Sequence, residues 1–291
     1  MRIISAEDVP AREVSGHRTG DIRFQRLLQG DPDRQDNYEF SLVRNGAPYY
    51  TPRHRHNFDQ VRMILEGEFS WASRRTMATG TVGYFPEGTH YGPQNVADCL
   101  TLILQCGAPS GHGFLSYDQL HQGHVELAKL GRFEDGIFRR DGASNLGPGT
   151  RRNQDGYEAI WEHMRGRRLA YPKARYGEPV IMHPDAFDWR PGDTPGHHQK
   201  PLGGFAGNVR VALHRLDAGA RATIAAERAT HLLFFLAGAG LCGGRRYGRW
   251  SAAEIDIAER VTIAAEEPSE LLAIGMAELG LPAAHSTPAA A

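Results

Sequence analysis

Short apolar runs separated by turn residues are the feature that most limits what this chain can fold into. Three such runs, DQVRMILEGEFSWA, TVGYFPEG and CLTLILQC, follow one another between Tyr49 and Cys106. The 34 glycines and 17 prolines are spread along the 291 residues rather than clustered. Strands at this regular spacing, bounded by glycine and proline, are typical of a β-sandwich or β-barrel. We therefore expect a fold dominated by β-structure.

The second half of the chain repeats this texture. The segments VRVALHRLDAGA, THLLFFLAGAG and ELLAIGMAEL resemble the strands of the first half, and the tripeptides LEG at 65–67 and LAG at 236–238 follow apolar strands at a spacing of roughly 170 residues. Similarity at a fixed spacing indicates an internal duplication. The sequence therefore predicts two β-barrels in tandem, the second one degenerate.

The stretch between the two predicted barrels differs from both. SYDQLHQGHVELAKLG has a polar cap, spaced apolar residues and a terminal glycine, and YEAIWEHMRGRRLA is a second helix candidate. We expect a first barrel over residues 1–110, a helical and loop linker over 111–178, and a second barrel over 179–281. Residues 282–291 are expected to be a disordered tail.

Charge and apolar content exclude several classes of partner. The formal net charge is -1 and the pI is about 6.9, which argues against a basic nucleic-acid groove. The longest apolar run, 232–242, is too short to span a bilayer, and the N-terminal residues have no apolar core of signal-peptide length. Three cysteines form no CxxC pair. We expect a cytoplasmic protein that binds neither nucleic acid nor membrane.

The segment His54-Arg55-His56 is the candidate site in the first barrel. Alternate residues of a strand point to the same face, so both imidazoles would project into the barrel, where they could share one metal ion. Gln60 and Arg62 keep the same parity if no bulge intervenes. The alternative for an isolated HxH pair is a solvated surface strand.

Residues 51–95 resemble the paired motifs of the cupin superfamily. HRH and Gly67 match the first motif, with Gln60 where the acidic residue usually stands. The glycine, proline and asparagine positions of the second motif are in register, at Gly80, Pro86, Gly88 and Asn95. HRH with Arg62 and the tripeptide EGE at 66–68 also locally resembles the ring-cleaving bicupins of the gentisate dioxygenase type.

This resemblance implies two double-stranded β-helix (jelly-roll) barrels, a bicupin, and a site for a divalent metal. Fe(II) is the first expectation, with Mn, Ni or Zn as alternatives, and a homodimer is expected. Metal ligands would be His54, His56 and a third histidine. The motif places that histidine at position 91, where this chain has tyrosine, and His90 stands one residue early.

The third ligand is therefore open between His90 and Tyr91. A shift of one residue turns a strand side chain to the other face, so only one of the two can point inward. We favour His90, because neutral imidazole is the commoner ligand and a tyrosinate must first lose a proton with a pKa near ~10. Tyr91 would then contact the substrate through its hydroxyl. Tyr84 has the parity of Pro86 and is a candidate to line the pocket.

Gln60 and Arg62 leave two alternatives each. Gln60 is either a fourth metal ligand or a hydrogen-bond partner of the substrate, and in both cases it adds no negative charge to the site. Arg62 either grips a substrate carboxylate or forms a salt bridge to Glu66 or Glu68 on the outside.

The second barrel lacks a comparable motif. Aligned on its glycine, it has His231 where the first barrel has Gln60, and Ala225 and Glu227 at the HxH positions. No PxGxxH segment follows. We expect this barrel to hold no metal and to serve packing, dimerisation or pocket closure.

The leading functional hypothesis is a metal-dependent dioxygenase acting on a small anionic aromatic or enolic substrate, a carboxylate or phenolate. A second is a metal-assisted isomerase, lyase or decarboxylase on the same barrel. A third is a non-enzymatic small-molecule-binding cupin in which Tyr91 displaces the metal. Cupins host many functions, so the fold does not choose among them.

Overall fold

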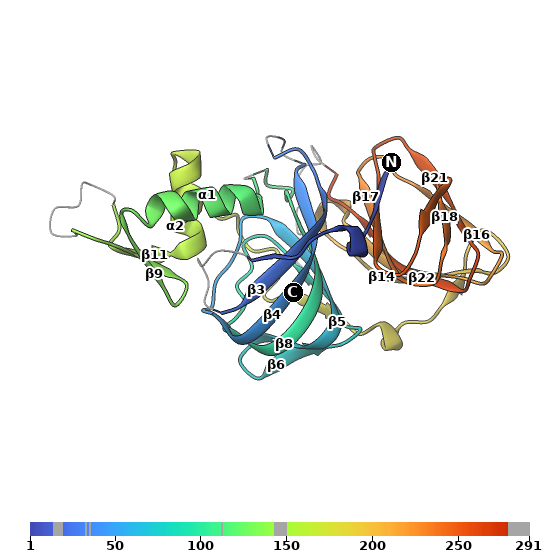
Figure 1. Cartoon of the computed structure of the whole chain (residues 1–291), viewed down its shortest axis with the longest axis horizontal. Coiled ribbons are helices and arrows are strands. Elements are labelled where there is room, and N and C mark those ends of the chain that lie inside the picture. The colour runs from blue at the N-terminus through green and yellow to red at the C-terminus, as the bar shows by residue number, and fades with distance from the viewer. Residues whose placement is uncertain (14–19, 33, 35, 112, 143–149, 279–291) are drawn as a thin grey trace, which may run out of the picture. The chain divides into compact units, whose positions relative to one another are not determined.

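The computed structural model describes residues 1–13, 20–32, 34, 36–111, 113–142 and 150–278, and the predicted tail at 282–291 lies outside them. The chain forms two compact units (Figure 1). Among the described residues, the first comprises those within 11–106 and 112–181, and the second comprises those within 1–10, 107–111 and 182–278. Within the described part of the chain, no helix is long and apolar enough to cross a membrane.

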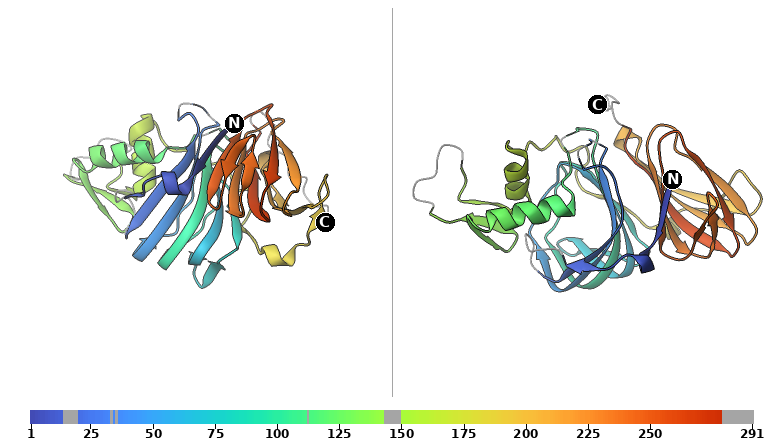
Figure 2. Two further views of the ribbon diagram at one scale, coloured as in Figure 1. Left: turned by 45° about the vertical axis from the view of Figure 1, so that its right-hand side comes forward. Right: turned by 45° about the horizontal axis from the view of Figure 1, so that its top comes forward.

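The first unit is built on one strongly curved sheet. Its strands are β2 (Arg12–Glu13), β3 (Ile22–Gln29), β4 (Tyr38–Thr51), β5 (Asp59–Ala72), β6 (Arg75–Ala78), β7 (Val82–Phe85), β8 (Gln94–Cys106) and β12 (Val180–Met182). They pair in the order β12-β7-β5-β8-β4-β3-β2, and β6 pairs with β5. In the right-hand view of Figure 2 the blue-to-cyan strands of this sheet curl into a barrel.

Strand β5 runs through the LEG tripeptide because its glycine has no side chain. Gly67 has a φ of +78°, and a Cβ at this position would lie 2.3 Å from the backbone oxygen of Asp98 on β8. Only glycine adopts this backbone conformation and this approach without strain. The pairing of β5 with β8 shifts register just before this point, between Ile64 and Glu66. The glycine therefore permits the bend that the barrel needs.

The segment after β8 forms a small helical layer on this barrel. It consists of α1 (Tyr117–Leu127), β9 (Gly131–Glu134), β10 (Ile137–Arg140), β11 (Asn153–Asp155) and α2 (Gly156–Arg165). Ser116 and Gln119 form a capping box at the start of α1, and Asp155 caps α2. Trp161 of α2 packs in one buried cluster with Phe58, which precedes β5. The predicted helices are therefore confirmed, and they pack on the first barrel.

The second unit consists of two sheets. The larger contains β1 (Arg2–Ser5), β20 (Ser251–Ile255), β17 (His231–Ala237), β22 (Ser269–Gly275), β15 (Arg210–Leu216), β14 (His197–Gly204) and β13 (Arg190–Pro191), in this order. The smaller contains β16 (Arg221–Ala225), β21 (Arg260–Ala265), β18 (Gly240–Cys242) and β19 (Arg245–Tyr247). Short 3-10 turns η1 (Ala6–Asp8), η3 (Pro184–Ala186) and η4 (Ala206–Asn208) complete the unit.

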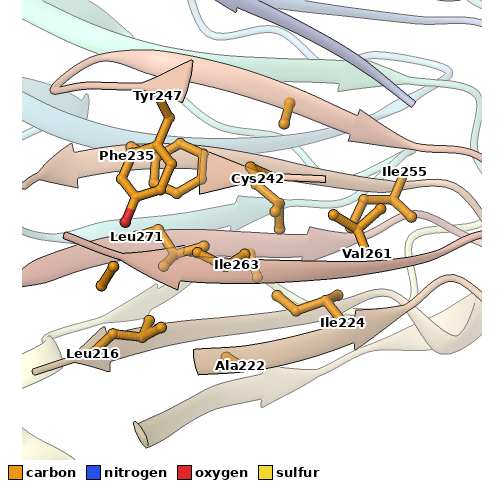
Figure 3. Packing of buried hydrophobic residues seen from close by; sticks show 14 of the residues in the cluster. Leu216, Ala222, Ile224, Phe235, Cys242, Tyr247, Ile255, Val261, Ile263 and Leu271 are labelled. Carbon is orange, nitrogen blue, oxygen red and sulfur yellow. The ribbon is translucent and has the colours of Figure 1, made fainter. Parts of the chain in front are cut away.

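Apolar side chains from both sheets fill the second barrel. Phe235 and Tyr247 stack with ring centroids 3.9 Å apart, and Leu271, Ile263 and Ile255 belong to the same buried cluster (Figure 3). A core closed in this way stabilises the unit through buried apolar area. The prediction of an all-β fold with a partly helical segment is confirmed.

Candidate active site

A cavity of about 90 Å³ lies inside the first barrel. At about 30 Å³ for each water, it has room for about three water molecules. Strands β3, β4, β5 and β8 form its walls, and Tyr117, Leu120 and Tyr157 of the two helices contribute to its lining. Its main polar groups are those of His54, His56, Gln60, Arg62, Gln94 and Gln105.

The structure brings His54 and His56 together on the wall of this cavity. Their ring centroids lie 4.9 Å apart with the rings at 87°. Nδ1 of His54 lies 2.7 Å from the backbone oxygen of Pro52. A carbonyl oxygen only accepts, so Nδ1 carries the proton, and when the ring is neutral Nε2 holds the lone pair. This is the tautomer that metal-binding histidines use when a backbone carbonyl orients them.

Tyr91, not His90, takes the inward position beside them. His54 and Tyr91 form an antiparallel pair, with His54 N donating to Tyr91 O at 2.9 Å and Tyr91 N donating to His54 O at 3.0 Å. Directly paired residues share a face, and their neighbours point the other way. The Tyr91 ring is buried with its centroid 4.5 Å from that of His54, whereas His90 is exposed. The prediction of His90 as the third metal ligand is therefore corrected.

The outward position of His90 also shows in its charge environment. Partial burial lowers its pKa, and the nearby guanidinium groups of Arg53 and Arg55 lower it further. Both arginines lie on the segment that pairs with Tyr91. His90 is therefore a surface imidazole among positive charges.

Gln60 is held by its neighbour on the same face of β5. Its Oε1 accepts from Nε and Nη2 of Arg62 at 3.0 and 2.7 Å, and from the hydroxyl of Tyr91 at 3.3 Å. Because Arg62 only donates, the amide oxygen must face it and the NH2 group must face away. An amide NH2 is a donor and not a metal ligand. The geometry thus favours hydrogen bonding over metal ligation for Gln60.

Arg62 is buried and lies over aromatic rings. Its guanidinium carbon is 4.9 Å from the ring centroids of Phe69 and Phe85. Across the described residues no carboxylate lies within ion-pair distance of it. Glu66, one of the two expected outer partners, is exposed and pairs with Arg44. The salt-bridge alternative is therefore wrong, and a positive charge faces the cavity.

Sequence reasoning missed three amides in this cavity, Asn45, Gln94 and Gln105. Gln105 on β8 is paired in register with Gln60, so both side chains point inward. Gln94 at the start of β8 is 1% exposed and lines the same cavity. The signal was available, because Gln105 shares the inward parity of Thr101 and Ile103 in the apolar run CLTLILQC.

A second polar cluster lies on the other face of β5. Asp59 is fully buried and accepts from the Tyr84 hydroxyl and from the backbone N–H of Glu87, each at 2.8 Å. Arg175 pairs with Glu87 at 3.3 Å. Burial raises the pKa of Asp59 to about 7, and the Glu87 carboxylate adds to the shift. Tyr84 pairs with Val61 rather than Gln60, so it does not line the cavity as expected.

The cavity residues fit a divalent ion only in part. Two imidazoles on one face, one with its tautomer set for ligation, are suitable nitrogen ligands. The Tyr91 hydroxyl and Arg62 both donate to Oε1 of Gln60, so that oxygen is already occupied. In the described ranges no three histidine, cysteine or acidic side chains cluster to hold a metal. The set fits an ion held by His54 and His56, with its other positions open to small oxygen ligands.

Three histidines of the second barrel form hydrogen bonds to the backbone or to one another. His231 donates from Nδ1 to the Ala229 backbone oxygen at 3.1 Å, and Nε2 of His197 lies 3.0 Å from Nδ1 of His214. Burial lowers the pKa of all three histidines, that of His214 to about 4. They are therefore neutral near pH 7. The prediction that this barrel holds no metal stays a prediction.

Comparisons with known proteins identify the fold. No protein-family model matches the chain, and no curated protein sequence matches it significantly. Among solved structures, a proposed dioxygenase of Nostoc punctiforme has a TM-score of 0.63 at 11% identity, covering 97% of this chain and 84% of its own. Bacillus subtilis oxalate decarboxylase, a protein with Mn(II) centres, has a TM-score of 0.57 at 14% identity, covering 95% and 77%.

A third similar structure is a Streptomyces albus enzyme, HEPD, with 2-hydroxyethylphosphonate and Fe(II) bound. It has a TM-score of 0.58 at 14% identity and covers 97% of this chain and 77% of its own. At these identities the similarity establishes the fold, and the gentisate-type detail stays a prediction. The chain has the bicupin fold, two cupin barrels in tandem.

Proposed function

We propose that the first barrel is the active site of a metal-dependent cupin enzyme that acts on a small organic anion. The observation that carries the proposal is the buried guanidinium of Arg62, which faces the cavity with no carboxylate partner among the described residues. A buried charge without a partner is costly, so such a site favours a ligand of opposite charge. Arg62 can bind a carboxylate in bidentate fashion.

We assign a distinct role to each of the other cavity residues. His54 and His56 would hold the ion, which when bound acts as a Lewis acid on substrate oxygen atoms. Gln60 orients Arg62 through its two hydrogen bonds and so positions the guanidinium. Tyr117, Leu120 and Tyr157 line the helical side of the cavity, where they would restrict the access of water.

The size of the cavity limits which substrates can bind. A volume of about 90 Å³ suits an enolic or hydroxylated acid of a few non-hydrogen atoms better than a substituted aromatic ring. Oxidation of such an acid by dioxygen is the first reaction that we propose to test. An isomerase, lyase or decarboxylase reaction is the second, and binding without turnover is the third, favoured by the inward Tyr91.

Anion binding tests the proposal directly. We expect acetate, glycolate, pyruvate and oxalate to compete for one site by isothermal titration, and Arg62→Met to weaken binding by at least 10-fold. Arg44→Met is the matched control, because Arg44 is a half-exposed arginine of the same barrel that pairs with Glu66 and Asp98 outside the cavity. Equal affinities in the wild type and Arg62→Met would refute the anion site.

Metal analysis and oxygen uptake separate the three activities. Protein purified without a tag is expected to bind Fe(II) or Mn(II), and His54→Ala is expected to lose it. Oxygen uptake with the bound acid indicates the oxygenase, and product formation without oxygen indicates the lyase or isomerase. Full metal binding in His54→Ala would show that the metal site has been assigned wrongly.

A further inference from the structure

We infer that the cavity of the first barrel selects carboxylic acids that carry a hydroxyl group, as an alcohol or an enol, and that Gln60 and Gln105 recognise that hydroxyl. The inference rests on the proposed function and narrows its substrate class. It is carried by buried amide atoms that have no partner although they line a cavity.

The donor side is Nε2 of Gln60. Gln60 is completely buried, and Arg62 fixes which way its amide faces, as described above. Nε2 has no hydrogen-bond partner. A buried N–H without an acceptor costs free energy, and it is satisfied when a ligand or water supplies an oxygen.

The acceptor side is Oε1 of Gln105. Gln105 lies directly across from Gln60 on β8, so the two side chains are neighbours on the inner face of the sheet. Its Oε1 is also buried and also has no partner. One unpaired donor and one unpaired acceptor therefore stand side by side without bonding each other.

A hydroxyl group is the functional group that satisfies both amides at once. Its oxygen accepts from Gln60 Nε2, and its hydrogen is donated to Gln105 Oε1. A ketone or ether oxygen accepts only and leaves Gln105 unpaired. An ammonium group donates only and leaves Gln60 unpaired, and a hydrogen or methyl group leaves both unpaired.

The carboxylate end of the ligand has its own donors. Arg62 lies on the same face of β5, two residues from Gln60. Gln94 is 1% exposed, lines the same cavity, and its Nε2 is likewise buried without a partner. Apart from the proposed ion, the cavity lining offers one guanidinium and no carboxylate, which suits a ligand with one carboxylate group. The structure therefore fits a hydroxylated monocarboxylate.

Matched pairs of small acids test this inference on the wild-type protein. Acetate with glycolate, and propanoate with lactate and 3-hydroxypropanoate, differ only by the hydroxyl group. The methyl ether of lactate, 2-methoxypropanoate, keeps the accepting oxygen but has no hydroxyl hydrogen to donate. We expect a hydroxy acid to bind about 10- to 100-fold more tightly than its parent acid, because a site built to bond a hydroxyl leaves buried groups unpaired when it is missing. The methoxy acid is expected to bind no more tightly than propanoate.

Gln105→Met removes the acceptor at nearly constant volume, so we expect the variant to bind a hydroxy acid no more tightly than its parent acid. Gln122→Met is the control, because Gln122 bonds Glu126 on the surface of α1. Equal binding of hydroxy and parent acids by the wild type would overturn the inference, as would a gain that survives in Gln105→Met. If parent acids still bind and need Arg62, the proposed anion site stands without the hydroxyl selectivity. If no acid binds at all, both the proposed anion site and the hydroxyl selectivity are refuted.

Discussion

Replacing Asp59 by asparagine is expected to flatten the pH dependence of the stability of the first barrel. Asp59 is buried beside Glu87, and burial is the main cause that raises its pKa from 3.8 to about 7. The folded barrel therefore binds the Asp59 proton more tightly than the unfolded chain does. This contribution to stability is fully present below about pH 4 and is lost as the pH rises through about 7.

The magnitude follows from the shift itself. At about 1.4 kcal/mol for each tenfold change in the acid dissociation constant, a pKa raised from 3.8 to about 7 corresponds to about 4 kcal/mol between the two ends of this pH range. Arg175 and the hydrogen bonds from Tyr84 and Glu87 stabilise the charged form and are already included in the raised pKa. Asparagine cannot ionise, so this pH-dependent part disappears in the variant.

Hydrogen exchange measured by mass spectrometry at pH 5, 6, 7 and 8 is a suitable assay. Peptides covering β5 and β7 report the local opening of the first unit, after correction for the intrinsic effect of pH on exchange. Asp141→Asn is the control, because Asp141 is an exposed aspartate of the same unit. An equal decline with pH in the wild type and in Asp59→Asn would refute the assignment of a buried, mostly protonated carboxyl at acidic pH.

Two other substitutions, with Gly80→Ala before β7 as a comparison, test the geometry of the turn that follows β7. Tyr91→His puts an imidazole on the inward face beside His54, and we expect it to raise the affinity for Zn²⁺ by at least 10-fold in a competition titration; unchanged affinity would contradict the inward position of residue 91. Gly88→Ala would place a Cβ 2.4 Å from the Pro172 backbone oxygen at a φ of +76°, whereas Gly80→Ala meets nothing within 4 Å at a φ of +86°. We expect urea denaturation to show a loss of more than about 2 kcal/mol for Gly88→Ala and about 1 kcal/mol for Gly80→Ala; similar losses would rule out the close contact.

The barrels and the two inward histidines follow from periodicities that are local in the sequence. Alternation along a strand is enough to place His54 and His56 on one face, and turn spacing is enough to predict strands. The position of residues 90 and 91 is different, because it depends on which residue pairs with His54 across the barrel. A bridge between His54 and Tyr91 decides this, and no pattern within residues 86–95 encodes it.

The roles of Gln60 and Arg62 were undecided for a related reason. Parity placed both inside, but the direction of an amide depends on which donors surround it. The contact between Arg62 and Gln60 Oε1 settles that direction, and it is visible only when side-chain geometry is known. Asp59 was missed because it has the outward parity, and outward residues of a barrel strand are expected in solvent unless another segment covers them. Here Arg175 and Tyr176 belong to such a segment.

The helical layer has a consequence for how such a protein can evolve. Tyr117, Leu120 and Tyr157 reach the cavity from the helical layer, whereas His54, His56, Gln60 and Arg62 come from the barrel itself. Substitutions in the helical layer can therefore reshape the cavity without disturbing the strand register. Under the proposed function, a lineage carrying this barrel could change its substrate by altering the helices while keeping His54, His56 and Arg62 in place.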